Sequence, residues 1–362
     1  MASNKNQHYV PQCYLRRFSS DDNRASINLM NIDRAKFVPN APIKGQCSKN
    51  YFYGKDLRLE KALQPIENNL ARVLDSVASK GYELTKEDSQ FLLHYWILQQ
   101  QRTEATSKRY VEMTGEIADA AKVPAQEFKI EMEQAVQDSI AMFLEVRGYL
   151  DDLKICLVKN ETDIEFITSD DPAVQASRLN MLTLRQTGRG FGLGSSGLFV
   201  ALPLTPKIQF IAYDSDIYQI PSSKGWVRAR QVQDIKFFNQ LQILNCRANL
   251  FVSCSSQQVH LSNLLKSSLK NRPQSKFKIN YLVLDESDVG QEVYRVVDRQ
   301  EFQNHSKGMI HQELHYPSPS IWASFLRLKA RKLAYSNGSA MGLIRAMHAR
   351  MHPDSDFKKA KL

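Results

Sequence analysis

Apolar and polar positions recur with two distinct periods along this chain of 362 residues. In the N-terminal part the apolar residues return mostly at the helical period. Those from Leu59 to Leu74 form one stripe within residues 57–78, which predicts an amphipathic helix. Before it, residues 26–39 alternate around an Asp-Arg pair and predict a β-hairpin, and Pro11 suits the start of a short helix.

Two further helices are expected before the period changes. Thr85, with Asp88 three residues later, is typical of a helix N-terminus and begins a helix that runs to about residue 121. Another helix is expected over residues 124–149. From Lys154 onward the period becomes two, which indicates strands. The expected strands cover residues 154–160, 163–169, 197–206 and 208–214, and residues 232–254 predict a helix followed by a buried strand.

Strands that cluster in the second half, after the helices, indicate an α+β fold. We expect an N-terminal hairpin and a helical layer packed on a β-rich second half. Residues 1–290 would form the core domain and residues 291–362 a polar, basic C-terminal extension. In that extension, helices are expected over residues 320–334 and 340–350, because Asn337-Gly338 separates two helix-compatible stretches.

The composition is that of a globular protein, since 43% of the residues are hydrophobic and 24% are charged. No apolar stretch approaches the ~18 residues of a transmembrane helix, and the N-terminus lacks the apolar segment of a signal peptide. The 5 cysteines are scattered without a C-x-x-C pair, which predicts neither a disulfide framework nor a zinc ribbon. We therefore expect a cytoplasmic protein that makes no membrane contact.

The positive charge is concentrated at the C-terminal end. Within residues 321–362 there are nine basic and two acidic residues, a net charge of +7 out of the total of +10. Such an excess suits a polyanionic partner, although solubility alone can also explain it. Four of these residues stand close to Trp322, Phe325 and Tyr335, a mixture that suits nucleic-acid contact. They are Arg327, Lys329, Arg331 and Lys332. An amphipathic helix that docks on the body or on a partner subunit explains the same stretch equally well.

Several phrases of the sequence resemble, in order and approximate spacing, a bacterial family catalogued as domain-of-unknown-function family 4238. They are His8-Tyr9-Val10-Pro11-Gln12 with Tyr14-Leu15 and Phe18, Lys49-Asn50 with Tyr53, Leu59-Glu60 with Glu67, Gln100 with Arg102-Thr103, and the stretches 166–172, 202–206 and 239–253. The resemblance covers about residues 5–260 and implies a bacterial or phage-related setting, but no mechanism. Asp171 stands where an asparagine is common in that family.

His8 is the first candidate for chemistry, since a histidine transfers protons near neutral pH. Gln12, Arg16 and Arg17 follow it and could bind a phosphate-bearing substrate. The alternative is a histidine that only anchors the N-terminus by hydrogen bonds.

Asp170 and Asp171 come at the end of an expected strand, where functional carboxylates are often displayed. Asp170 could orient His8, and both carboxylates together with Glu67 could bind a divalent cation. Two interpretations without a functional role stay open. The Ser-Asp-Asp-Pro sequence also suits a turn, and exposed glutamates usually form a solvated helix face.

Arg102 continues an apolar face of its helix and is interpreted as an anion ligand or a residue at the edge of that face. Gln100, two residues earlier, is a further candidate for substrate binding. The glycine run of residues 188–197 lacks the strand–helix context of a dinucleotide site, so it is interpreted as a loop that closes over the site. His311 and His315 have a zinc-like spacing, but neighbouring prolines disfavour a helix there.

These patterns lead to one functional expectation with two alternatives. The expectation is a nucleic-acid-directed hydrolase, a ribonuclease-like effector of defence or toxin type, in which His8, Asp170 and Arg102 are catalytic. The first alternative is a protein that binds nucleic acid or a partner without catalysis, and the second is a phosphate-ester or nucleotide hydrolase whose glycine loop closes on a small substrate. RNA is expected ahead of DNA, and a homo-oligomer or a regulatory protein partner is left open.

Overall fold

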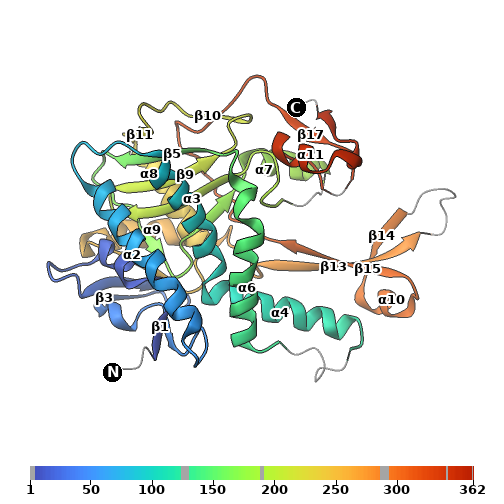
Figure 1. The fold of residues 1–362 in the computed structure, drawn as a ribbon, viewed down its shortest axis with the longest axis horizontal. Helices are drawn as coiled ribbons and strands as arrows, with labels where there is room; N and C mark the ends of the chain where they lie inside the picture. The colour runs from blue at the N-terminus through green and yellow to red at the C-terminus, as the bar shows by residue number, and fades with distance from the viewer. Residues whose placement is uncertain (1–4, 124–129, 188–190, 286–292, 340, 361) are drawn as a thin grey trace.

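The structure, a computed structural model, describes residues 5–123, 130–187, 191–285, 293–339, 341–360 and 362 (Figure 1). Its architecture is α+β, as predicted from the clustering of strands in the second half. A helical layer packs against a central sheet, and smaller sheets extend that body on several sides. Among the described residues, no helix combines the length and the apolar character that crossing a lipid bilayer requires.

Five strands form the central sheet in the order β11-β5-β9-β8-β7. Only β11 and β5 run parallel, and the other neighbours are antiparallel. Three strands match the predicted period-two stretches closely. The bounds are β5 (Lys154–Asn160), β7 (Val174–Ala176), β8 (Phe199–Thr205), β9 (Ile208–Tyr213) and β11 (Trp226–Ala229).

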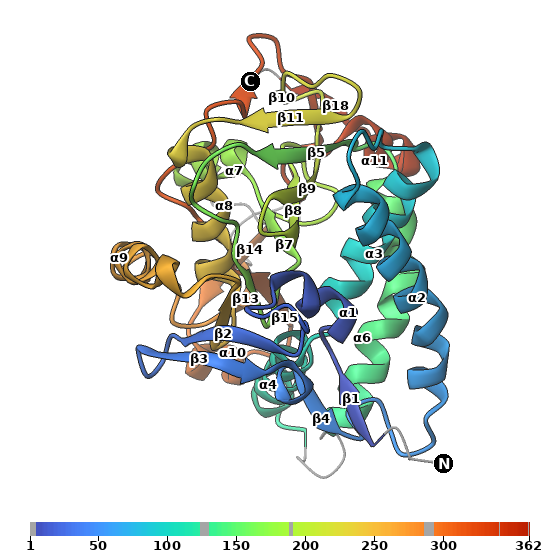
Figure 2. The same ribbon diagram turned by 90° about the vertical axis from the view of Figure 1, so that its left-hand side faces the viewer.

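Helices cover both faces of this sheet (Figure 2). The long helices α2 (Arg58–Ala78) and α3 (Lys86–Gln101) lie on one side, and α8 (Val232–Asn245) lies on the other. Alternate residues of β5 therefore join different cores: Leu157 packs beneath α2 and α3, whereas Cys156 and Val158 pack beneath α8. Burial on both faces explains why these strands are almost wholly apolar.

A second sheet has the order β3-β2-β12-β6 and is antiparallel throughout. Its hairpin of β2 (Ser26–Asn31) and β3 (Lys36–Pro42) confirms the predicted one. The strand β12 (Asn249–Val252) follows α8, as expected, and α9 (Gln258–Leu269) packs on the same core. Beside this sheet, β1 (Asn6–His8) pairs with β4 (Ser48–Asn50), and α1 (Gln12–Leu15) begins after Pro11.

The strand expected over residues 163–169 is shorter than predicted, since only β6 (Thr168–Ser169) pairs with β12. The Asn160 side chain explains the difference. Its amide donates to the Ile164 carbonyl at 2.6 Å, and its oxygen accepts from the Thr162 amide at 2.9 Å. These local bonds hold the segment in a turn in place of a strand.

The prediction of one helix from Thr85 to about residue 121 is also wrong, because this stretch forms two helices. The first, α3, begins as predicted, with the Thr85 hydroxyl accepting from the Asp88 amide. It ends at Gln101, and α4 (Glu104–Ala120) begins beyond Thr103, whose extended backbone (φ −81°, ψ 154°) interrupts the helical path. Helix α6 (Met132–Val146) then packs on α3 and α4, whereas residues 124–129 of the predicted helix lie outside the described part.

Residues beyond 270 form a third sheet that projects from the body beside α4 (Figure 1). Its order is β14-β13-β15, and α10 packs on it. The expected strands did not include any of these three, and His311 lies on a strand, so it has no helical spacing to His315. The bounds are β13 (Phe277–Asp285), β14 (Val293–Val297), α10 (Arg299–Asn304) and β15 (Gly308–Leu314).

The C-terminal segment is bound to the body and is mostly not helical. The helix predicted over residues 320–334 is absent, because Ala323, Phe325 and Leu326 insert into the core beneath α8. The second predicted helix is shorter than expected and is α11. The elements are β10 (Tyr218–Gln219) paired with β16 (Arg327–Leu328), β17 (Ala334–Ser336) paired with β18 (Lys358–Ala360), and α11 (Ala346–Met351).

One basic residue of this segment is buried and anchors it. Arg345 forms an ion pair with Asp152 at 2.9 Å and donates to the carbonyls of Leu193 and Ser195. The glycine run follows α7 (Arg178–Thr187), and from Gly192 on it is held by these bonds, so the interpretation as a closing loop does not fit. Its first residues, 188–190, lie outside the described part.

Candidate functional site

The break between α3 and α4 directs two neighbouring side chains to different parts of the molecule. The Arg102 amide still donates to the Leu98 carbonyl and closes α3. Thr103 accepts from the Thr106 amide and so begins α4. Arg102 reaches the N-terminal strand, whereas the Thr103 hydroxyl donates to Asp171 Oδ1 at 3.0 Å.

Arg102 is completely buried and bound by protein groups. Its guanidinium donates to the Tyr53 hydroxyl at 2.9 Å, to the His8 carbonyl at 2.9 Å and to the Glu67 carboxylate at 2.7 Å. The remaining nitrogen, Nη1, is buried without a hydrogen-bond partner in the described part of the chain. Arg102 therefore connects β1 and α2 to the end of α3, a structural role that was not predicted for it.

His8 and Arg102 do lie together, but through the backbone of His8. The His8 ring is half-buried, and its Nε2 lies 3.2 Å from the Lys44 carbonyl. Burial lowers the pKa of this histidine, with Arg102 and Arg16 acting in the same direction. The ring is consequently neutral near pH 7, and its anchoring contact matches the structural alternative for this residue.

Asp170 does not have the geometry of the catalytic or cation-binding residue that was expected. Only 4% of it is exposed, and both carboxylate oxygens are occupied. Oδ1 accepts from the Arg247 amide at 2.8 Å, and Oδ2 accepts from the Ala248 and Asn249 amides at 2.9 Å. This carboxylate therefore supplies the acceptors for the turn between α8 and β12, because three backbone donors converge there.

The predicted cation site of Asp170, Asp171 and Glu67 is not assembled either. Glu67 pairs with Arg102, while Asp170 is bound to the turn amides. In the parts of the chain that the structure describes, no three His, Cys, Asp or Glu side chains gather as metal ligands would.

Asp171, in contrast, lines a cleft between α4, the end of α8 and the start of the projecting sheet. This Asp171 cleft has a volume of about 510 Å³. Among the residues that the structure describes, five cationic side chains and one further carboxylate, that of Glu112, line it. The cations are Lys108, Arg109, Arg247, Arg272 and Lys276.

The Asp171 carboxyl titrates in an unusual range for an aspartate. Burial raises its pKa to about 6, against the opposing effect of Arg109 and Lys276 and of the Thr103 hydrogen bond. Oδ1 accepts from Thr103, and the backbone on either side is held by Ser169 and Asn245. A fixed carboxyl that changes charge near neutral pH has the properties of a general acid or base.

Lys276 is the second perturbed group of the cleft. Burial, reinforced by Arg272, lowers the pKa of its amine to about 8. Nζ donates to the carbonyls of Leu244 and Asn245 at 2.5 and 3.1 Å. Arg272 likewise donates to the Ile243 carbonyl at 2.8 Å, so both cations occupy the C-terminal end of α8, where the helix dipole favours positive charge.

Glu104 neutralises part of the positive charge on the neighbouring wall. Its carboxylate accepts from Lys49 at 2.7 Å and lies 2.8 Å from Lys108 and 3.9 Å from Arg247. Burial opposes its ionisation, but hydrogen bonds from the two lysines outweigh burial and lower its pKa to about 2. Arg109, whose guanidinium donates to the Thr106 hydroxyl at 3.3 Å, forms no ion pair with a described residue and is the cation with the largest electrostatic effect on Asp171.

The other predicted substrate-binding residues lie away from this cleft, and none of them lines it. Arg17 pairs with Asp75 at 2.7 Å, and Arg16 donates to Gln12. Gln100 donates to Gln175 at 2.8 Å. Those on the C-terminal segment, Arg327, Lys329, Arg331 and Lys332, are exposed or half-exposed.

Sequence reasoning missed every cation of the Asp171 cleft. They come from three separate stretches: Lys108-Arg109 on α4, Arg247 after α8, and Arg272 with Lys276 in the turn before β13. The only signal in the sequence was the basic, turn-like stretch of residues 271–276. Nothing in the spacing of these residues indicates that they meet Asp171.

Comparison with known proteins gives a family but no function. The family model described as Protein of unknown function (DUF4238) matches residues 6–256. No curated protein matches the chain, and no solved structure matches it.

Proposed function

Since this chain belongs to the DUF4238 family, whose description assigns no activity, we propose from its own residues that it is a nucleic-acid-directed hydrolase whose catalytic site is the Asp171 cleft. One observation carries the proposal: a buried carboxyl with a pKa of about 6 lines a cleft of mainly cationic side chains. Such a cleft attracts phosphate groups, and the carboxyl supplies a base at neutral pH.

In this proposal Asp171 and Lys276 divide the proton transfers, because their pKa values lie on opposite sides of 7. The Asp171 carboxylate takes a proton from the attacking water. As the water oxygen bonds to phosphorus, the bond to the leaving oxygen breaks, and the Lys276 ammonium protonates that oxygen. Arg109 stabilises the charge that develops on the phosphoryl oxygens. RNA is the first substrate to test.

The substitution Asp171→Asn tests the assignment. It keeps the size of the side chain and an acceptor for Thr103, but it removes the base. We expect cleavage of labelled RNA to fall at least ~100-fold, the usual contribution of a general base. Glu112→Gln is the matched control, since Glu112 lines the same cleft, is exposed and is expected to be dispensable. Equal turnover in wild-type and Asp171→Asn protein would remove the assignment.

The pH dependence of turnover is a separate expectation. Activity should rise as Asp171 loses its proton through about pH 6 and fall as Lys276 loses its proton through about pH 8. A plot of kcat/KM against pH should therefore be a narrow bell centred near neutrality. In Lys276→Arg protein the alkaline limb of this plot should shift to higher pH by more than one unit, because a guanidinium stays protonated. An alkaline limb that does not move would show that another group donates the proton.

A second candidate, binding of a nucleic acid without turnover, is favoured by one observation. Only 5% of Asp171 is exposed, whereas the cations of the cleft are half-exposed or exposed, so a phosphate group reaches them more readily than a substrate reaches the carboxyl. Under this alternative, Asp171→Asn protein would bind the same ligand with unchanged affinity, and the wild-type protein would release no product.

A further inference from the structure

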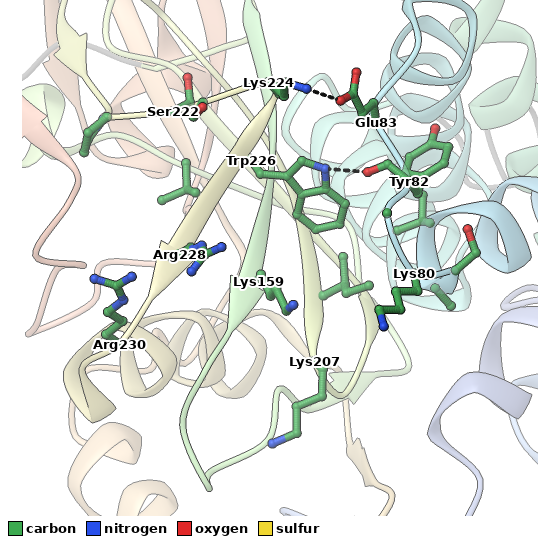
Figure 3. A pocket seen from close by; sticks show the side chains of 18 of the residues that line it. Lys80, Tyr82, Glu83, Lys159, Lys207, Ser222, Lys224, Trp226, Arg228 and Arg230 are labelled. Atoms are coloured by element: carbon green, nitrogen blue, oxygen red, sulfur yellow. Dashed lines mark hydrogen bonds and ion pairs between the residues drawn. The ribbon is translucent and has the colours of Figure 1, made fainter.

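A second cationic cavity lies at the edge of the central sheet, where β11 and β5 pass the turn between α2 and α3 (Figure 3). This Trp226 groove has a volume of about 990 Å³. Among the described residues that line it, Glu83 is the one carboxylate. Its six cations are Lys80, Lys159, Lys207, Lys224, Arg228 and Arg230.

The strand register gathers these cations on one face. In the parallel pair, Arg228 of β11 lies opposite Lys159 of β5. Two like charges opposite each other on neighbouring strands destabilise a sheet unless an anion lies between them. Because successive side chains of a strand alternate between its faces, Trp226, Arg228 and Arg230 share the face that carries Lys159. The sheet thus holds positive charge in a position that its own stability does not favour.

Acidic neighbours compensate only part of this charge. Glu161 lies 3.4 Å from Arg228 and 3.1 Å from Arg230, and Glu83 pairs with Lys224. Lys80 and Lys159 form no ion pair with a described residue, and both are exposed. The six cations therefore face two carboxylates, which leaves an excess of four positive charges along one groove.

The Trp226 ring is a fixed aromatic surface among these cations. The Trp226 indole Nε1 donates to the Tyr82 carbonyl at 3.1 Å, which holds the ring in one orientation (Figure 3). The residue is half-buried, so part of the ring stays accessible in the groove. A tryptophan held in place by a hydrogen bond and flanked by cations matches the arrangement that binds single strands, in which a base stacks on the ring and phosphates contact the cations.

We propose that the Trp226 groove binds single-stranded nucleic acid, with one base stacked on Trp226 and the flanking phosphates bound by Lys159 and Arg228. A duplex is a poorer ligand, because its bases are stacked on one another. The groove and the Asp171 cleft are separate sites, because no described residue lines both and β11 lies far from α4 in both ribbon views (Figures 1 and 2). The inference goes beyond the proposed hydrolysis, because it concerns binding and requires no turnover at Asp171.

The test measures the affinity of the full chain for fluorescein-labelled single strands by anisotropy, with a 20-residue RNA and a DNA of the same sequence. Trp226→Ala should raise Kd about 10-fold or more, as expected when the stacking of one base is lost. Trp226→Phe should stay within a few-fold of wild type, because a phenyl ring still stacks. If Trp226→Phe and Trp226→Ala lose affinity equally while both remain folded by circular dichroism, stacking is excluded and the proposal fails.

The charge contribution has a matched control in the chain itself. Lys159→Gln/Arg228→Gln should weaken binding about 10-fold and reduce the slope of log K against log salt by about 1.4, the value for two phosphate contacts on a single strand. Arg34→Gln/Lys36→Gln removes the same charge from the exposed tip of the hairpin of β2 and β3, which does not line the groove, and should leave Kd within about twofold of wild type. Loss of binding in that control alone, or equal competition by heparin and by a single strand, would overturn the proposal.

Repeating the titration with Asp171→Asn protein separates the two proposals. Unchanged binding by this variant is expected, since Asp171 does not line the groove. Tight binding by a wild-type protein that cleaves nothing would contradict the hydrolase and leave the groove standing. If the groove variants cleave RNA with the wild-type KM and bind single strands with the wild-type Kd, the groove proposal fails and the hydrolase proposal stands.

Discussion

Replacing Arg102 with methionine should lower the free energy of unfolding by about 3–5 kcal/mol, the usual cost of removing one partner from a buried ion pair. The guanidinium bonds Glu67, the Tyr53 hydroxyl and the His8 carbonyl from a fully buried position. Methionine fills a similar volume but leaves all three acceptors without this donor. Urea unfolding followed by fluorescence measures the loss.

Arg17→Met is the control for this experiment. Arg17 also forms an ion pair across to α2, with Asp75 at 2.7 Å, but 69% of the Asp75 side chain is exposed. Pairs of this kind contribute at most about 1 kcal/mol. A similar small loss for both variants would show that the Arg102 contacts contribute no more than a surface pair, and the structural role assigned to Arg102 would have to be abandoned.

The same substitution at the two neighbouring aspartates should change stability in opposite directions. Asp170→Asn places an amide group where three backbone amides need acceptors, so we expect a loss of about 2–4 kcal/mol. Asp171→Asn removes a carboxylate that burial disfavours and retains an acceptor for Thr103, so stability at pH 7.5 should rise. Unfolding midpoints of both variants in urea at pH 7.5 measure the two effects.

The pH dependence gives the size of the Asp171 effect. Its pKa is about 6 in the folded chain against 3.8 for an unperturbed aspartate, so between these values the folded state holds a proton that the unfolded state has lost. Stability from this group is therefore full below about pH 4 and is lost as the pH rises through 6, by about 3 kcal/mol in total. The advantage of Asp171→Asn protein should accordingly vanish near pH 4. An advantage that persists there would mean that ionisation is not its cause.

A gain in stability together with a loss of turnover would indicate that Asp171 is kept for function and not for folding. Functional sites commonly retain groups that the fold would be more stable without. A structural residue such as Asp170 should show the reverse, with lower stability.

The local spacing of apolar and turn residues was sufficient to predict many helices and strands of this protein. The stripe of α2, the hairpin of β2 and β3, and the order of α8 and β12 all follow from the spacing of apolar residues and from turn residues. Those signals act between positions a few residues apart, so they survive in the sequence alone. Of the three residues predicted to be catalytic, His8 and Arg102 lie together through the His8 backbone, whereas Asp170 is bound to the turn after α8.

Other features were decided by contacts between distant segments. At the break between α3 and α4, Thr103 bonds Asp171, 68 residues away, and the apolar C-terminal residues joined the core beneath α8 instead of forming a helix. Which of two adjacent aspartates is bound by a turn and which faces a cleft depends on Arg247 and Lys276, which no local period connects to either. Local spacing therefore determined many of the elements, whereas burial and long-range polar contacts, which exist only in the folded chain, decided the remaining elements and the chemistry of the site.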